Sequence, residues 1–321
     1  MDEPRSVLAA PSQPSPYAWY ARLPPMAFDG DIGLWVVAAP ALVKQALAHP
    51  SLRVRPPAEP VPQALLGRPT GEVFARLVRM TDGEFHARHR PAVSAAAARI
   101  DHAMVEHAAE AATRNLAGRV STDALLSAVP VQAMARLLGV AEAELDRTVA
   151  WVHDFTRGIA AGASAESLDR SDAAVAGLLA QADGLEPVTA ANRIAFMQQA
   201  LDATAGLIGN GIVAWQAEGK VAMEQVARND PAIHNTRRFS AEDFVLGGAR
   251  IAAGQGLVLL LANPRAGLEF GSGVHACPGD RIALAIAATA LRTLEQEGAL
   301  QKIGTPRAYR PLPNARIPVF G

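Results

Sequence analysis

The sequence has little cysteine, little charge of either sign in excess and no long apolar run, and each shortage excludes a class of protein. One cysteine in 321 residues excludes an internal disulfide and predicts a reducing, cytoplasmic setting. A formal net charge of −1 gives no general attraction to nucleic acid or to an anionic membrane. Uncharged apolar runs such as residues 256–263 are too short to span a bilayer. The first residues lack the basic stretch and apolar core of a signal peptide, so we expect no leader and no anchor.

The sequence does contain enough apolar residues for a large core, since half of its residues are hydrophobic and 19% are charged. Periodicity and proline positions predict an irregular lead-in over 1–30, a strand over 33–40, a helix over 41–49 and a loop over 55–70. The helical patterns that follow cover residues 83–118, 121–139, 142–162, 165–183, 188–219 and 220–229.

The texture changes after Pro231, where short β-like runs are separated by glycine pairs that are typical of hairpins. A last helix is expected over 278–297, and the tail 309–320 is expected to form a further hairpin strand. We therefore predict a mainly α fold with a smaller β region, in a single domain over residues 1–321.

The lone cysteine lies in a distinctive loop, Phe270–Gly279, with the sequence FGSGVHACPG. Gly271 and Gly273 permit a tight turn with positive φ. Cys277 then stands just before a helix, whose N-terminal N–H groups and dipole stabilise an anionic sulfur. Gly279 lets the backbone approach a flat ligand, and His275 can reach an acidic group at the edge of that ligand.

This loop resembles the heme-binding loop of the cytochrome P450 family, F-G-x-G-x-H-x-C-x-G, at every fixed position. The resemblance implies the cytochrome P450 fold in a shortened form, with heme b as the cofactor and Cys277 as the axial ligand of the iron. A thiolate ligand favours O–O bond cleavage. By the same resemblance Phe270, His275 and Gly279 lie against the heme.

Further segments resemble the family in the expected order. Residues 79–93 resemble its C helix, in which His86 and Arg90 would hold a heme propionate from one helix face. Zinc binding at His86 and His89 is not expected, because no carboxylate completes a metal motif there. Residues 227–239 resemble the end of the K helix and the following strand, where Arg238 would bind a propionate, with Arg237 as the one-residue alternative.

Residues 191–216 resemble the long I helix on the distal side of the heme. The resemblance places Leu201, Asp202, Ala205 and Gly206 nearest the iron. Asp202 is the expected proton-delivering acid, and Thr204 is a candidate alcohol. The predicted substrate pocket is small and apolar, and takes residues from the 60–78 loop and from this helix and the later strand, namely Met197, Leu201, Ala205, Ile233 and His234.

The sequence departs from the family in three places. The K helix carries Gln225 where the family has glutamate, so we expect Glu224, one position earlier, to pair with Arg228. The segment from Arg228 to Cys277 is shorter than usual. The position that normally holds the distal threonine is Ala203, and Thr204 is turned by about 100° on the helix.

These residues predict a monooxygenase that oxidises a small, largely apolar molecule with O2. Because no reductase segment is present, the electrons would come from a separate ferredoxin and ferredoxin reductase, with Arg76, Arg79 and Arg88 as a surface for an acidic partner. Two alternatives stay open. One is heme-thiolate chemistry driven by peroxide or without monooxygenation, and the other is a non-catalytic heme-binding protein.

Overall fold

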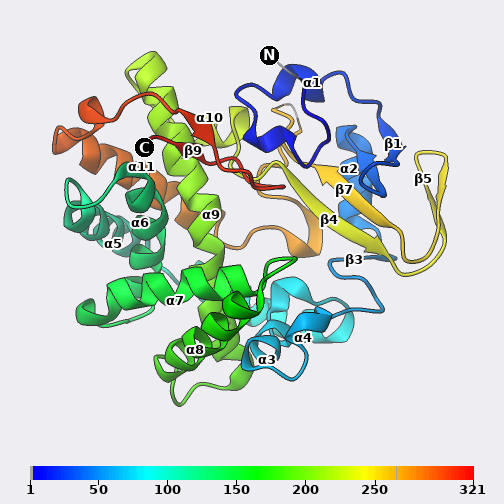
Figure 1. The fold of residues 1–321 in the computed structure, drawn as a ribbon, viewed down its shortest axis with the longest axis horizontal. Coiled ribbons are helices and arrows are strands. Elements are labelled where there is room, and N and C mark those ends of the chain that lie inside the picture. The colour runs from blue at the N-terminus through cyan, green and yellow to red at the C-terminus, as the bar shows by residue number, and fades with distance from the viewer. Residues whose placement is uncertain (1–2, 265) are drawn as a thin grey trace. The chain divides into compact units, whose positions relative to one another are not determined.

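The structure is a computed structural model that describes residues 3–264 and 266–321. Backbone packing divides the chain into two compact units, each built from segments that are separated in sequence. Unit 1 comprises Met1–Ala58, Gly206–Asp280 and Ile303–Gly321, and unit 2 comprises Glu59–Ala205 and Arg281–Lys302. The single domain expected from the sequence stays a prediction. The mainly helical fold with a smaller β region is confirmed (Figure 1).

All strands found in residues 3–264 and 266–321 belong to unit 1. Its elements are η1 (Ala10–Ser12), α1 (Tyr17–Tyr20), β1 (Met26–Asp29), β2 (Leu34–Val37), α2 (Pro40–Ala48), β3 (Leu52–Arg53), α10 (Met223–Asn229), β4 (Asn235–Ser240), β5 (Phe244–Leu246), β6 (Ala249–Ile251), β7 (Gly256–Leu260), η5 (Gly273–His275), β8 (Ala308–Tyr309) and β9 (Pro318–Val319).

The main sheet of unit 1 has the order β1-β2-β7-β4-β3. Strand β7 pairs parallel with β2 and antiparallel with β4, and all five of its residues are buried. Because successive side chains point to opposite faces, Leu257 and Leu259 enter one core, whereas Val258 and Leu260 enter another. Burial of one such side chain contributes roughly 1.5–3 kcal/mol.

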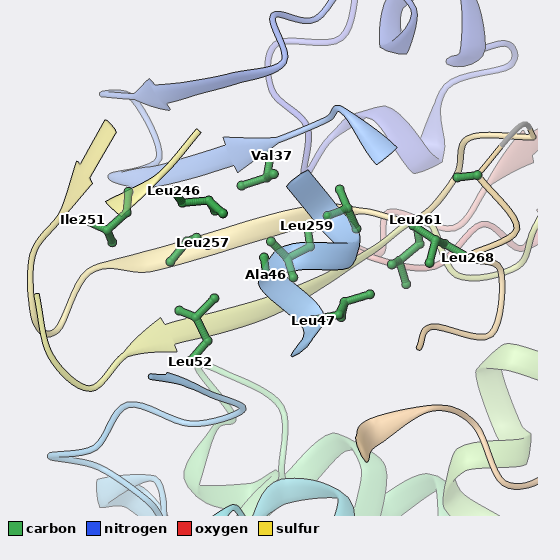
Figure 2. Close-up of a cluster of buried hydrophobic side chains, with 12 residues drawn as sticks. Val37, Ala46, Leu47, Leu52, Leu246, Ile251, Leu257, Leu259, Leu261 and Leu268 are labelled. Atoms are coloured by element: carbon green, nitrogen blue, oxygen red, sulfur yellow. The ribbon is translucent and has the colours of Figure 1, made fainter. Parts of the chain in front are cut away.

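The first of these cores lies between the sheet and helix α2, as Figure 2 shows. Ala46 and Leu47 of α2 contribute to it, and so does Leu268, which lies two residues before the first residue of the cysteine loop. The second core is closed by the lead-in segment through Val7 and Tyr20. The chain that leads into the cysteine loop is therefore anchored in the first core at Leu268.

Unit 2 is helical. Its elements are η2 (Gln63–Leu65), α3 (Pro69–Ala75), η3 (Val78–Met80), α4 (Gly83–Ala98), α5 (His102–Leu116), α6 (Thr122–Leu137), η4 (Glu142–Glu144), α7 (Leu145–Gly158), α8 (Ala165–Ala180) and η6 (Leu300–Lys302). Helix α9 (Pro187–Glu218) and helix α11 (Asp280–Gln296) each contribute residues to both units.

Helices α7 and α8 pack closely because two glycines leave room at their contact. A Cβ on Gly158 would lie 2.2 Å from the Cβ of Ser171, and a Cβ on Gly177 would lie 2.4 Å from the ring of Trp151. No helix in the described ranges has the length and the hydropathy that a membrane crossing requires.

Three expectations from the sequence were wrong in detail. The lead-in is not irregular throughout, because α1 forms and β1 pairs with β2 in strands too short for their alternation to be recognised. The helix expected over 83–118 is two helices, since the side chain of Asp101 caps α5 by accepting hydrogen bonds from the N–H groups of Ala103 and Met104. The loop expected over 55–70 contains η2 and the first two residues of α3.

Candidate functional site

The cysteine loop of unit 1 has the backbone that its glycines predict. Gly271 and Gly273 have φ of 69° and 72°, a conformation that other residues rarely adopt. The N–H of Cys277 donates to the carbonyl of Phe270 at 2.9 Å, which closes the loop on itself. Cys277 is exposed and stands three residues before the first residue of α11. The loop therefore presents its thiol outward, close to the N-terminus of a long helix.

The loop rests on the C-terminal end of α2. A Cβ on Gly273 would lie 3.3 Å from the carbonyl oxygen of Leu47, so a larger residue would push the loop away. Gly279 differs, because a Cβ there would meet no atom within 4 Å. The backbone beside Gly279 is thus open, as the approach of a flat ring requires. His275 is half-buried at the end of η5.

Two adjacent arginines on β4 are distinguished by their burial. Arg238 is 6% exposed, and its guanidinium donates to Thr236 Oγ1 at 3.1 Å and to the carbonyl of Arg237 at 2.8 Å. Arg237 itself points to solvent. A guanidinium held by neighbouring residues is better prepared to bind a carboxylate than a mobile one, because less side-chain entropy is lost on binding. Arg238 is therefore the better candidate of the two.

Unit 2 contributes the second pair of basic side chains, both on α4. His86 is 6% exposed and Arg90 is half-buried, and the two lie one helical turn apart. The spacing matches a pair that would hold one carboxylate from a single helix face. The structure thus keeps both candidates on one helix, as the sequence predicts, while their role stays a prediction.

Helix α9 has two distinct faces around the predicted acid and alcohol. Met197, Leu201, Thr204 and Ala205 are each at most 2% exposed, so protein atoms already cover this face. Asp202 and Ala203 lie on the half-buried side of the same helix, together with Gln198. The place of Met197, Leu201 and Ala205 in a substrate pocket stays a prediction.

Gly206, which the resemblance placed near the iron, packs within unit 1. A Cβ on Gly206 would lie 2.7 Å from the Cβ of Ala232 and 2.7 Å from the carbonyl oxygen of Arg316. Only glycine allows this part of α9 to approach that segment so closely. The need for glycine here is explained by packing.

Arg79 was predicted as an exposed contact for a partner, and this prediction was wrong. Its side chain is half-buried and donates to Gln198 Oε1 on α9 at 2.8 Å. Its Nε is buried without a hydrogen bond, and burial lowers the pKa of the guanidinium to about 10. Arg88 is exposed and Arg76 is half-buried, so these two remain available to solvent. Sequence reasoning missed the inward position of Arg79 because η3 is too short to show a periodic face.

A second polar group that the sequence did not predict lies in unit 1. It consists of Tyr17, Tyr20, Asp230, His234 and Arg316, and is called the Arg316 cluster below. Arg316 is 2% exposed and pairs with Asp230 at 2.8 Å. Asp230 also accepts a hydrogen bond from the hydroxyl of Tyr17, and the hydroxyl of Tyr20 lies 2.8 Å from His234 Nδ1.

Arg316 also joins distant segments of the chain. Its guanidinium donates to the carbonyls of Pro11 at 3.1 Å and of Pro14 at 2.8 Å, and stacks on the ring of Tyr309 at 3.5 Å. The backbone N–H of Arg316 donates to the carbonyl of Ala232 at 2.8 Å. The cluster thereby connects the lead-in, the end of α10 and the C-terminal hairpin.

His234 belongs to this cluster and is completely buried. Its Nε2 lies 3.4 Å from the hydroxyl of Tyr17, so tyrosines flank both of its ring nitrogens. Burial, followed by the charge of Arg316, lowers the pKa of His234 to about 3. The histidine is therefore neutral at pH 7 and packs between the two tyrosines inside unit 1. Ile233, beside it, is half-buried and bridges to Ala315.

The ion pair expected between Glu224 and Arg228 does not form. Glu224, Gln225 and Arg228 are all exposed on α10, and no ion pair or hydrogen bond joins the side chain of Arg228 to any residue in the described ranges. The reason is geometric, because the buried side of this short helix carries Met223, Val226 and Ala227.

Comparisons with known proteins agree with this geometry at the level of fold. No known sequence family profile matches the chain, and no curated protein matches it in sequence. Among solved structures, P450BioI in complex with a hexadec-9Z-enoic acid-ligated acyl carrier protein matches with a TM-score of 0.76 and 18% identity, over 95% of this chain and 96% of that one.

Two further cytochromes P450 match nearly as well. RauA, complexed with a biosynthetic intermediate of aurachin RE, has a TM-score of 0.73 and 20% identity, with 97% of each chain covered. Epothilone B-bound P450epoK has a TM-score of 0.73 and 19% identity, over 95% of this chain and 96% of that one. The chain therefore has the cytochrome P450 fold that its cysteine loop predicts.

Proposed function

We propose that this protein, which has the cytochrome P450 fold, is a heme-thiolate enzyme that oxidises a small, largely apolar organic molecule with O2 and two electrons. The observation that carries the proposal is the loop Phe270–Gly279, which has the family pattern at every fixed position and presents an exposed Cys277. No protein atom lies within 4 Å of the position that a Cβ on Gly279 would take, so a flat macrocycle could approach the backbone there. The positive φ of Gly271 and Gly273 gives the tight turn that places the thiol beside this open position.

The cofactor in this proposal is heme b. In unit 1, Cys277 would bind the iron, His275 and Arg238 would bind propionates, and Phe270 and Gly279 would contact the ring. In unit 2, His86 and Arg90 would bind propionates. Because the only cysteine serves as the iron ligand, no thioether bond would attach the macrocycle to the chain. Each charge-assisted hydrogen bond to a propionate is worth roughly 1.5–3 kcal/mol.

When bound, the heme would supply the activation of oxygen, which a thiolate ligand promotes by donating electron density to the iron. The chain's own contribution is to deliver protons. Asp202 lies on the half-buried side of α9, from which a carboxylate can exchange protons with solvent. Ala203, its neighbour, has no hydroxyl to hold a water molecule, and Thr204 is 1% exposed. Proton delivery in this protein would therefore depend on Asp202 more than on Thr204.

The electrons in this proposal come from a separate ferredoxin and its reductase. Arg76 and Arg88 remain on the surface of unit 2 for an acidic partner. The setting we propose is the cytoplasm, in keeping with one exposed, unbridged cysteine.

A second candidate, peroxide-driven oxidation, is favoured by Ala203 and by the burial of Thr204. Peroxide brings its own protons, so a site without a distal hydroxyl loses less with peroxide than with O2. A non-catalytic heme protein is the third possibility, and the absence of product with either oxidant would select it.

The experiment that tests the proposal compares three proteins: the wild type, Ala203→Thr and Thr204→Ala. Each is supplied with surrogate redox partners and a ligand that shifts the heme spectrum, and product formed per NAD(P)H consumed is measured. We expect low coupling in the wild type, a rise in Ala203→Thr and little change in Thr204→Ala. Efficient coupling in the wild type that Thr204→Ala abolishes would show that Thr204 is the working alcohol.

A further inference from the structure

The guanidinium of Arg79 in unit 2 has no compensating charge, although the side chain is half-buried and its Nε is completely buried. In the part of the chain that the structure describes, no carboxylate pairs with it, and its contacts are Gln198 Oε1 at 2.8 Å and the sulfur of Met80 at 3.3 Å. Its Nε has no hydrogen-bond partner. Removing a cation from water costs free energy when no opposite charge replaces the solvent, so a partly buried arginine in this position favours an anionic ligand.

The backbone that carries Arg79 is held firmly on both sides. Asn192 of α9 accepts a hydrogen bond from the N–H of Val78 at 3.1 Å and donates to the carbonyl of Arg76 at 2.9 Å. Leu77 and Val78 are at most 1% exposed. The η3 turn is therefore fixed against α9, and the guanidinium is oriented before any ligand arrives.

The position of Gln198 connects this arginine with the proposed oxidation. Gln198 lies four residues before Asp202 on α9, so the two side chains share the half-buried face of that helix. A separation of four residues corresponds to a rise of about 6 Å along the helix axis. A group bound at Arg79 would thus be held about one turn away from the acid that we propose delivers protons.

We propose that Arg79, oriented by Gln198, binds the carboxylate of the substrate, and that the protein therefore acts on an organic acid with an apolar body. A guanidinium has two parallel donors that match the two oxygens of a carboxylate. The cost of leaving Arg79 unpaired is removed when the acid binds, and this cost favours an acid over a neutral molecule of the same shape. The inference deepens the proposed function and rests on it.

The test uses the heme-loaded protein and two matched pairs of ligands: decanoic acid with decan-1-ol, and 4-phenylbutyric acid with 4-phenylbutan-1-ol. Binding is measured by calorimetry and by the shift of the heme spectrum. We expect the wild type to bind each acid at least about tenfold more tightly than the alcohol, and Arg79→Gln to lose this preference through a fall of about 10- to 100-fold in affinity for the acid. Arg79→Lys should restore part of the preference.

Arg114→Gln is the matched control, because it removes one positive charge from the same unit at an exposed site paired with Glu110. This variant should keep the full preference. The proposal is overturned if the wild type binds acid and alcohol equally, which needs no variant, or if Arg79→Gln keeps the preference. It is also overturned if Arg79→Gln loses heme while Arg114→Gln keeps it, because Arg79 would then bind a propionate of the cofactor. A protein that shows the acid preference by calorimetry but no thiolate-ligated heme would refute the proposed function alone.

Discussion

The cysteine loop and the Arg316 cluster lie in the same unit, yet they are built in opposite ways. The loop is made from ten consecutive residues, its thiol is exposed, and its conformation depends on two glycines. The cluster is made from residues as far apart as Tyr17 and Arg316, and its ion pair joins a buried arginine to a half-buried aspartate. The difference indicates that a short segment can define a ligand site, whereas distant residues must meet to hold the surrounding chain in place.

The exposed position of Arg228 on α10 shows that this helix is held by a different ion pair from the one that the family pattern predicts. In the family pattern the K helix carries a glutamate and an arginine that pair with each other, and here no such pair forms. Asp230, which follows α10 directly, instead pairs with Arg316 of the C-terminal segment. The end of α10 is thus anchored by an ion pair that reaches across the chain.

The largest expected effect is at the loop. Cys277→Ala should abolish the red-shifted Soret band of the reduced CO complex, because that band requires a thiolate ligand on the iron. The neighbouring variant Val274→Ala, at a side chain that is 65% exposed, should keep it. A Cys277→Ala protein that retained the band would show that the thiol is not the ligand, and the loop would lose its proposed role.

The next effect is at the ion pair of Asp230 with the buried Arg316. Asp230→Asn keeps the shape of the side chain but leaves Arg316 as an unpaired charge, so the free energy of unfolding should fall by about 3–5 kcal/mol. Asp243→Asn, which breaks the exposed pair with Arg250 in the same unit, should cause no measurable change. Urea unfolding of both variants measures the contrast. Equal effects would mean that burial does not distinguish the two pairs.

Adjacent arginines on β4 provide a smaller test. Arg238→Ala should weaken heme retention by roughly 1.5–3 kcal/mol, the value of a charge-assisted hydrogen bond to a carboxylate. Arg237→Ala should leave heme retention unchanged, because this side chain points to solvent. Heme transfer to apomyoglobin measures the loss in each variant. The reverse result would shift the strand assignment by one residue.

The smallest effect is a dependence of stability on pH that comes from His234. Its pKa is about 3 when folded and 6.5 when it is free, so the unfolded chain binds one more proton between these values. This histidine therefore favours unfolding as the pH falls below 6.5, by up to about 1.4 kcal/mol per pH unit. Comparing the unfolding free energy of the wild type and His234→Gln from pH 7 to 5 should show a shallower slope in the variant. Identical slopes would mean that His234 titrates normally in the fold.

The sequence alone predicts those features of the structure that depend on residues close together in the chain. It predicted the glycine conformations of the cysteine loop, the order of the helices and the hairpin turn at Gly247 and Gly248, because each depends on residues that are close in the chain. It also predicted the fold, since the loop pattern is long and specific. The loop in particular needs only steric freedom at two glycines and the start of a helix after the cysteine.

Only the tertiary structure decided which polar side chains are buried and with which partners. Arg79 turned inward because Asn192 fixes its turn against α9, and Arg316 met Asp230 because separate segments converge. Neither contact can be recognised from a periodic pattern in the sequence. Val78 and Asn192 are 114 residues apart, and Asp230 and Arg316 are 86 residues apart. A charged side chain becomes buried when the free energy of packing its neighbours exceeds the cost of removing it from water, and that balance depends on the whole folded chain.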